Sequence, residues 1–182
     1  MVTCRTIITR ALQQATIVPL GRDPTSKEAE AGLSALQGMY EGWVSGSMFG
    51  RLKDVYQDAD YTANVGDRIF ADDATITLPD TIERDGFDAV PYDLGAVSVN
   101  DGTWRHWIWD GVWTEITGLT LDTDAPLASR DREGLAACLA GYLAEGFGGQ
   151  IGPFTQRRAA RFESSLSLKL GSTQDASAPS YF

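Results

Sequence analysis

Several residues and patterns on which protein chemistry commonly depends are scarce in this sequence. It holds one histidine and two cysteines among 182 residues. Two imidazoles therefore cannot share a metal ion, and no Cys-x-x-Cys spacing exists. Cys4 and Cys138 lie far apart, which favours buried, reduced thiols over a disulfide between them. We expect neither a metal nor a cofactor.

Other functional patterns are missing as well. No apolar run approaches the roughly 18–20 residues of a membrane helix, and the first residues do not form a signal peptide, so we expect no membrane association. The glycines of 148–152 lack the lysine and the preceding strand of a phosphate loop. The acids at 72–73, 80 and 122–124 could bind calcium, but they do not follow the twelve-residue calcium loop, which favours a solvated acidic face. We predict that the protein is not an enzyme.

Charge is distributed very unevenly along the chain. Residues 54–126 hold sixteen Asp or Glu and three Arg, a net charge of −13, whereas the two flanking segments together carry +3. This balance argues against general affinity for DNA phosphates, which requires lysines and arginines to release counterions. The acidic middle has the pattern of β structure and the flanks have the pattern of helices. The sequence thus indicates a helical body that carries an acidic β insertion.

Hydrophobic residues at helical spacing predict about four helices. They cover about 3–16, 25–45, 129–147 and 153–170. Thr25 and Glu28 have the form of a capping box, while Thr3 can cap the first helix and either Ser129 or Asp131 the third. The second helix contains glycines at 32, 38 and 42. These predict a close backbone approach, either to another helix of the chain or to a neighbouring subunit.

The insertion, over about 66–121, is predicted to be antiparallel. A short strand covers 74–78, and strands at 97–99, 104–109 and 112–116 form a three-stranded meander. Its second turn is Asp-Gly at 110–111, which favours a two-residue hairpin loop. That loop places Trp109 opposite Val112, Ile108 opposite Trp113, and His106 opposite Glu115. We interpret His106 as half of a structural cross-strand pair rather than as a catalytic base.

Both faces of the predicted meander are apolar. One face carries Trp104, Ile108 and Trp113, and the other carries Trp107, Trp109, Val112 and Ile116. A lone sheet can rest on one body only, so the second face should meet another part of the fold or another subunit. The four tryptophans are therefore predicted to form the sheet core and a subunit or tail interface. Stacking of these tryptophans on sugars is the alternative.

The last twelve residues, 171–182, form a small polar segment that ends in two aromatics. The segment could be a disordered end. We favour instead a flexible tail that becomes ordered on a partner and inserts its aromatic residues. The candidate anchor residues are Ser177, Pro179, Tyr181 and Phe182.

The order of these pieces resembles a head-to-tail adaptor, or connector, protein of tailed bacteriophages and gene transfer agents. The stretches that carry the resemblance are 6–12, 24–33, 39–43, 77–79, 109–116, 119–121, 125–127, 134–140 and 159–162. The resemblance implies an α+β fold: mainly an α-helical bundle of about four helices with an antiparallel β insertion and an extended C-terminal tail. Residues 1–170 would then form a single adaptor domain, and 171–182 its flexible tail.

The resemblance also implies partners and a location. Members of this family form a homo-oligomeric ring, usually of twelve copies, below the portal protein of the virion. The ring extends the channel for double-stranded DNA, which passes without specific binding, and it offers its lower face to the downstream tail or stopper protein. The protein would be made in the host cytoplasm and reside in the virion neck. Its C-terminal tail would bind the portal. A carbohydrate- or receptor-binding tail protein that uses the tryptophan hairpin is the alternative function.

Overall fold

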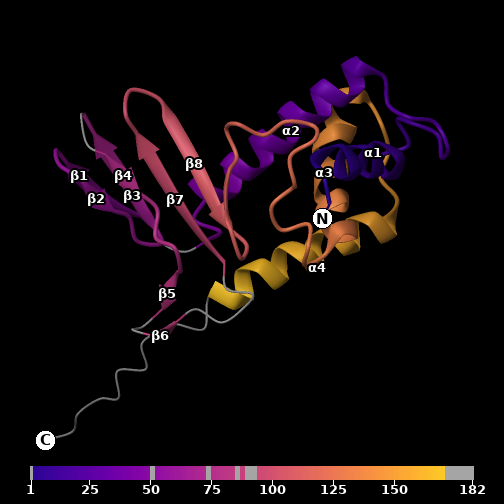
Figure 1. Cartoon of the computed structure of the whole chain (residues 1–182). Coiled ribbons are helices and arrows are strands. Elements are labelled where there is room, and N and C mark those ends of the chain that lie inside the picture. The colour runs from indigo at the N-terminus through magenta and orange to yellow at the C-terminus, as the bar shows by residue number, and fades with distance from the viewer. Residues whose placement is uncertain (1, 50–51, 73–74, 85–86, 89–93, 171–182) are drawn as a thin grey trace, which may run out of the picture.

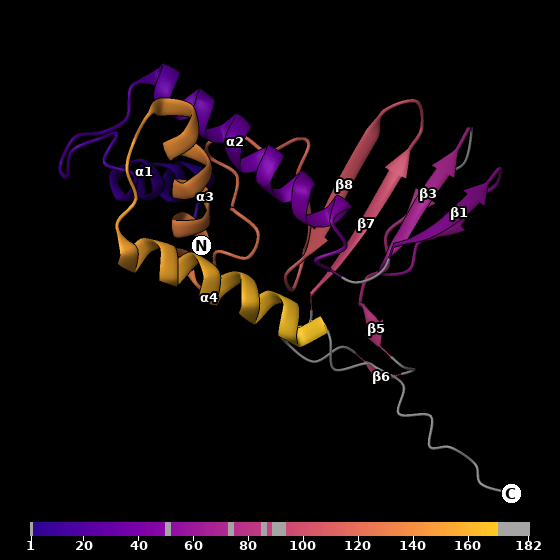
Figure 2. The same cartoon turned by 180° about the vertical axis from the view of Figure 1, so that it is seen from behind.

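The computed structural model describes residues 2–49, 52–72, 75–84, 87–88 and 94–170, which form a mixed helix-and-sheet fold (Figure 1). The helices among these residues are α1 (Cys4–Gln14), α2 (Ser26–Ser45), α3 (Arg132–Phe147) and α4 (Pro153–Leu170). They gather on one side, and the sheet lies beside them with its outer edge farthest from α1 and α3 (Figures 1 and 2).

Local side-chain capping fixes where the helices begin. The Thr25 hydroxyl accepts a hydrogen bond from the Glu28 amide, and Glu28 Oε2 accepts one from the Thr25 amide at 2.7 Å. The predicted capping box is therefore confirmed. Thr3 caps α1, and Asp131 rather than Ser129 caps α3.

Gly32 allows α1 and α2 to pack closely. A Cβ atom at Gly32 would overlap the Cγ2 atom of Ile8, which is 1% exposed in the core shared by the helices. The close approach expected at this glycine is therefore made to a helix of the same chain. A Cβ atom at Gly38 or Gly42 would meet no heavy atom within 4 Å beyond the nearby backbone of α2 itself, so these two positions have space for a side chain.

Alanine substitutions at Gly32 and at Gly42 should therefore change the stability of the protein in opposite directions. We expect Gly32→Ala to lower the free energy of unfolding by about 1–3 kcal/mol, because the added methyl group overpacks the contact with Ile8. Gly42→Ala, the matched control, should raise it by about 0.5–1 kcal/mol through helix propensity. Urea unfolding of the two variants measures both effects. Equal stabilisation by the two substitutions would contradict the close packing of α1 on α2.

The β insertion contains one large sheet and two small ones. The strands are β1 (Lys53–Gln57), β2 (Tyr61–Thr62), β3 (Asp67–Ala71), β4 (Ile76–Thr77), β5 (Glu83–Arg84), β6 (Phe87–Asp88), β7 (Gly95–Asn100), β8 (Trp104–Trp109) and β9 (Trp113–Glu115). The large sheet has the order β1-β3-β7-β8-β9, while β2 pairs with β4 and β5 with β6. The predicted strand over 74–78 is thus the two-residue β4.

The large sheet is mixed, so the prediction of an antiparallel insertion is wrong for half of it. The pairs β7–β8 and β8–β9 are antiparallel, which confirms the predicted meander. The pairs β1–β3 and β3–β7 are parallel. Parallel neighbours need a crossover connection. The chain makes the first crossover through β2 and begins the second through β4, and these two strands pair with each other outside the large sheet.

Both faces of the large sheet are covered by the same chain. The residues buried between the large sheet and its neighbours in the insertion are Ala63, Ile69, Ala71, Val97 and Val99, with side chains of β2 and β4 packed against them. On the other face, Ala96, Ile108 and Ile116 belong to the core of the helices. The second apolar face therefore meets another part of the fold, the first of the two expected alternatives.

The hairpin between β8 and β9 has a different register from the predicted one. Trp109 lies opposite Trp113 and Ile108 opposite Thr114, so the loop holds three residues, 110–112, instead of two. A shift of one residue transfers every side chain of a strand to the other face.

This shift corrects the predicted faces. Trp113 shares a face with Trp109, and the centroids of the two rings are 5.4 Å apart. His106 lies opposite Ser98 rather than Glu115.

The Asp110 carboxylate joins this hairpin to the segment that enters α3. Asp110 Oδ2 accepts hydrogen bonds from the Leu127 amide (2.9 Å) and the Ser129 hydroxyl (2.7 Å), and Oδ1 accepts one from Arg130 Nε (2.9 Å). The side chains of Asp110 and Arg130 are only 12% and 11% exposed. These three contacts bind the end of the sheet to the helical side of the molecule.

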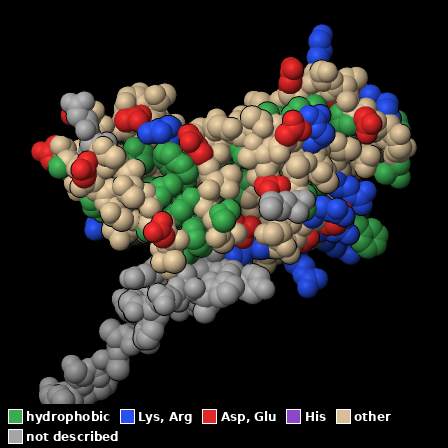
Figure 3. Space-filling view, viewed as in Figure 1, with side chains coloured by type: hydrophobic (Ala, Val, Ile, Leu, Met, Phe, Trp, Pro, Cys, Tyr) green, Lys and Arg blue, Asp and Glu red, His purple; other side chains and the backbone are tan. Residues whose placement is uncertain are grey.

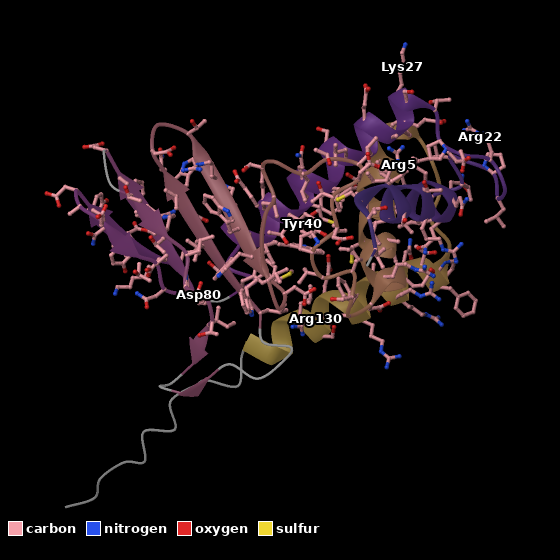
Figure 4. The ribbon with its side chains drawn as sticks, viewed as in Figure 1. Arg5, Arg22, Lys27, Tyr40, Asp80 and Arg130 are labelled. Carbon is pink, nitrogen blue, oxygen red and sulfur yellow. The ribbon has the colours of Figure 1, made fainter. Side chains whose placement is uncertain are left out.

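A second contact ties α2 to the same segment. The Tyr40 hydroxyl donates a hydrogen bond of 2.6 Å to the Pro126 carbonyl. Burial raises the pKa of Tyr40, so the phenol remains a donor at neutral pH. Tyr40 and Arg130 both lie where the helices meet the base of the sheet (Figure 4). The next residue, Leu127, has a φ of 68°, a left-handed conformation that these neighbouring contacts hold in place.

Removal of the Asp110 carboxylate should be strongly destabilising. We expect Asp110→Ala to lower the free energy of unfolding by about 3–5 kcal/mol, since it breaks a largely buried ion pair and leaves the Leu127 amide without this acceptor. Asp101→Ala is the matched control, because the Asp101–Arg105 pair is 39% and 43% exposed and should contribute no more than about 1 kcal/mol. Chemical denaturation compares them. Similar losses would show that Asp110 has no special role at the junction.

Candidate functional site

The structure does not bring the four predicted interface tryptophans onto one surface. Trp107, Trp109 and Trp113 lie on the face that is covered by the insertion itself, and Trp113 Nε1 donates a hydrogen bond to the Pro79 carbonyl at 2.8 Å. Trp104 lies on the other face and is 37% exposed. Of the four, Trp104 is thus the most exposed, while the other three are partly buried. The proposed anchor residues Ser177, Pro179, Tyr181 and Phe182 lie outside the described residues.

Trp104 belongs to a row of aromatic side chains that crosses the large sheet. We call Tyr56, Phe70 and Trp104 the aromatic row. The ring centroids of Tyr56 and Phe70 are 5.0 Å apart and stacked, and those of Phe70 and Trp104 are 5.4 Å apart, edge to face. Tyr56, on the edge strand β1, is 75% exposed. Two aromatics with exposed surface therefore stand on one face of the sheet, beyond its contact with the helices.

Charged groups lie directly beside the aromatic row. Arg68, in β3, bonds Asp54 through its Nε at 2.6 Å, and its guanidinium lies 5.7 Å from the centroid of the Phe70 ring. The hydrogen bond from Arg68 lowers the pKa of Asp54. The chain thus already places a guanidinium against a carboxylate and an aromatic ring on this face.

Parallel pairing gathers acidic residues at one end of the sheet. The strands β1, β3 and β7 run in the same direction, so their carboxyl ends meet at one edge. Asp58 and Asp60 follow β1, and Asp72 follows β3; we call these three the acidic edge. All three are exposed, and no ion pair joins them to other described residues. Asp80, by contrast, lies toward the opposite end of the sheet (Figure 4).

The one pair that resembles a catalytic dyad is buried in the sheet. Ser98 Oγ lies 2.8 Å from His106 Nδ1, but Ser98 is only 1% exposed and cannot reach a substrate. Burial lowers the pKa of His106, and the charge of Glu41 partly opposes this. The geometry fits the structural pair that we predicted for His106, with Ser98 as the partner in place of Glu115.

Neither cysteine has the properties of a nucleophile. Cys4 and Cys138 are free and buried, as the sequence favours. Burial raises the pKa of Cys4 to about 11 and that of Cys138 to about 12. Both thiols therefore remain protonated at neutral pH, whereas reactive cysteines are thiolates.

In the part of the chain that the structure describes, no three His, Cys, Asp or Glu side chains are placed to share a metal ion. None of the helices in this part combines the length and the apolar character needed to span a bilayer.

No known family model matches the sequence, and no curated protein matches it.

Acidification should weaken the fold through His106. Its pKa in the folded state lies below that in the unfolded chain, so the unfolded chain binds this proton more readily. The free energy of unfolding should thus fall as the pH drops through about 6.5 toward the folded-state pKa. We expect His106→Gln to lose this part of the pH dependence. Urea unfolding at several pH values from 7.5 to 5.5 (about one unit on either side of 6.5) measures it. If the free energy of unfolding depends on pH in the same way for the wild type and for His106→Gln, His106 does not cause the loss of stability in acid.

Proposed function

We propose that this chain is a structural head-to-tail adaptor of a tailed bacteriophage or gene transfer agent. In this proposal, copies form a ring below the portal, and the ring extends the DNA channel and provides the attachment site for the tail. The chain would act without a cofactor and without catalysis. The observation that carries the proposal is the arrangement of the chain: four helices contributed by both ends, and an acidic β insertion that projects from them.

The connection between the two parts supports a mechanical role. The Asp110 contacts and the shared core bind the insertion firmly to the helices. A subunit of a channel must hold its shape while DNA passes and while the tail is attached. A projecting sheet fixed at its base meets this requirement better than one on a flexible linker.

The charge of the insertion supports a role near DNA without binding. A net charge of −13 over 54–126 repels phosphates at short range, with screening beyond about 8–10 Å at physiological salt. If many of these acids face the channel, every copy in the ring adds to the same field. DNA would then slide without adhering to the wall.

The predicted C-terminal tail is the proposed portal contact. Deletion of 171–182 should leave the fold intact and should abolish attachment of the purified protein to capsids that carry the portal. Co-sedimentation with such capsids measures attachment, and replacement of 171–175 by a Gly-Ser linker of equal length is the control that keeps the aromatic end. If the protein still attaches to the capsids after the deletion, residues 171–182 are not the portal-binding segment.

A further inference from the structure

A second unusual surface lies on α4. Phe154, Arg157, Arg158 and Arg161 occur at i, i+3, i+4 and i+7, so they form one stripe along the helix, which we call the basic stripe. All four are exposed, and Phe154 is 82% exposed. The opposite side of α4 is buried through Phe162 and Leu166. Phe154 thus adds an exposed aromatic side chain to a row of arginines.

The basic stripe has more positive charge than its surroundings neutralise. Arg158 shares Glu133 with Arg10 and Arg132, at 3.2, 3.0 and 3.7 Å, so three guanidinium groups face one carboxylate. Arg157 and Arg161 make no ion pair with the described residues. The stripe therefore fits a partner that offers carboxylates together with aromatic surface.

The aromatic row and the acidic edge have this composition. They present exposed Tyr56 and Trp104 beside Asp58 and Asp72, which have no counterion among the described residues. The dimensions also agree. The row crosses four strands, roughly 14 Å, and the basic stripe spans roughly 10 Å from its first to its last residue.

The two surfaces lie at opposite ends of the molecule. The sheet edge at β1 is on one side and the first turn of α4 is on the other, in both views (Figures 1 and 2). In the space-filling view, red side chains lie at the outer end of the sheet, and blue side chains, with some red ones among them, lie over the helices at the opposite end (Figure 3). Complementary surfaces at opposite ends cannot meet within one chain.

We infer that the basic stripe of one copy docks on the aromatic row and acidic edge of the next copy. Arginines of α4 would approach the carboxylates of the acidic edge and the faces of Tyr56 and Trp104. The contact is heterologous, so repetition produces a ring or an open filament. This inference rests on the proposed function, because it names the surfaces by which the copies of the ring join.

The experiment uses two variants of the full chain, each with one surface reversed. Asp58→Arg with Asp72→Arg changes the acidic edge, and Arg157→Glu with Arg161→Glu changes the basic stripe. The control, Asp23→Arg with Glu30→Arg, has the same charge change as the first variant, on exposed residues outside both surfaces. Circular dichroism and thermal unfolding establish that each variant is folded.

Sedimentation velocity then measures self-association. The wild type and the control should form oligomers, and the dissociation constant of each reversed variant should rise at least about tenfold. An equimolar mixture of the two reversed variants should associate again, because the intact stripe of one variant meets the intact edge of the other, and the two reversed surfaces are also opposite in charge. High salt should weaken this association.

Three results would overturn the inference. The wild type could stay monomeric at roughly 100 μM, the reversed variants could assemble like the wild type, or their mixture could stay monomeric. If both reversed variants form oligomers with the same dissociation constant as the wild type, these two surfaces do not form the contact between copies. The adaptor proposal is not affected by that result. Failure of the wild-type protein to attach to portal-bearing capsids would instead reject the adaptor proposal.

Discussion

The carboxylate of Asp110 is the interaction on which the architecture depends. It accepts hydrogen bonds from the Leu127 amide, the Ser129 hydroxyl and Arg130 Nε, all from the segment that leads into α3. These donors occupy both oxygens, so the hairpin end cannot rotate relative to the helices without leaving polar groups unpaired. The base of the sheet can then join the helical core through Ile108. The acidic insertion and the helical body are thus joined by a shared core and by buried polar contacts.

This attachment at the base of the sheet determines which side chains remain exposed at its free end. The helices cover the base of one face and the insertion's own strands cover the other face, so the exposed aromatics Tyr56 and Trp104 lie beyond the contact with the helices. Parallel pairing of β1 with β3 aligns Tyr56 with Phe70, and Asp58 and Asp72 follow the last residues of these two strands. The proposed contacts between copies use this end, which is consistent with a part that is built for assembly.

The sequence predicts the elements that depend on interactions between residues close together in the chain. It predicts less well the features that depend on contacts between residues far apart in the chain. The capping box at Thr25 and the four helices follow from short-range patterns, as does the meander. The register of the β8–β9 hairpin does not, because its Asp110 bonds residues 17 to 20 positions away and the loop takes a third residue. The aromatic row escaped prediction for a related reason: β1 and β3 are short and polar on one face, and only their parallel pairing brings Tyr56 beside Phe70.

The central claim, that this chain is a ring-forming adaptor, is tested most directly by a cryo-electron microscopy map of the neck of the particle that encodes it. The account predicts a ring of this chain between the portal and the tail, with acids of 54–126 facing the channel or the tail-side surface. Density for the chain at a peripheral site such as a tail fibre would contradict the account. A ring with these acids mainly on the outer wall would contradict the proposed repulsion of DNA in the channel.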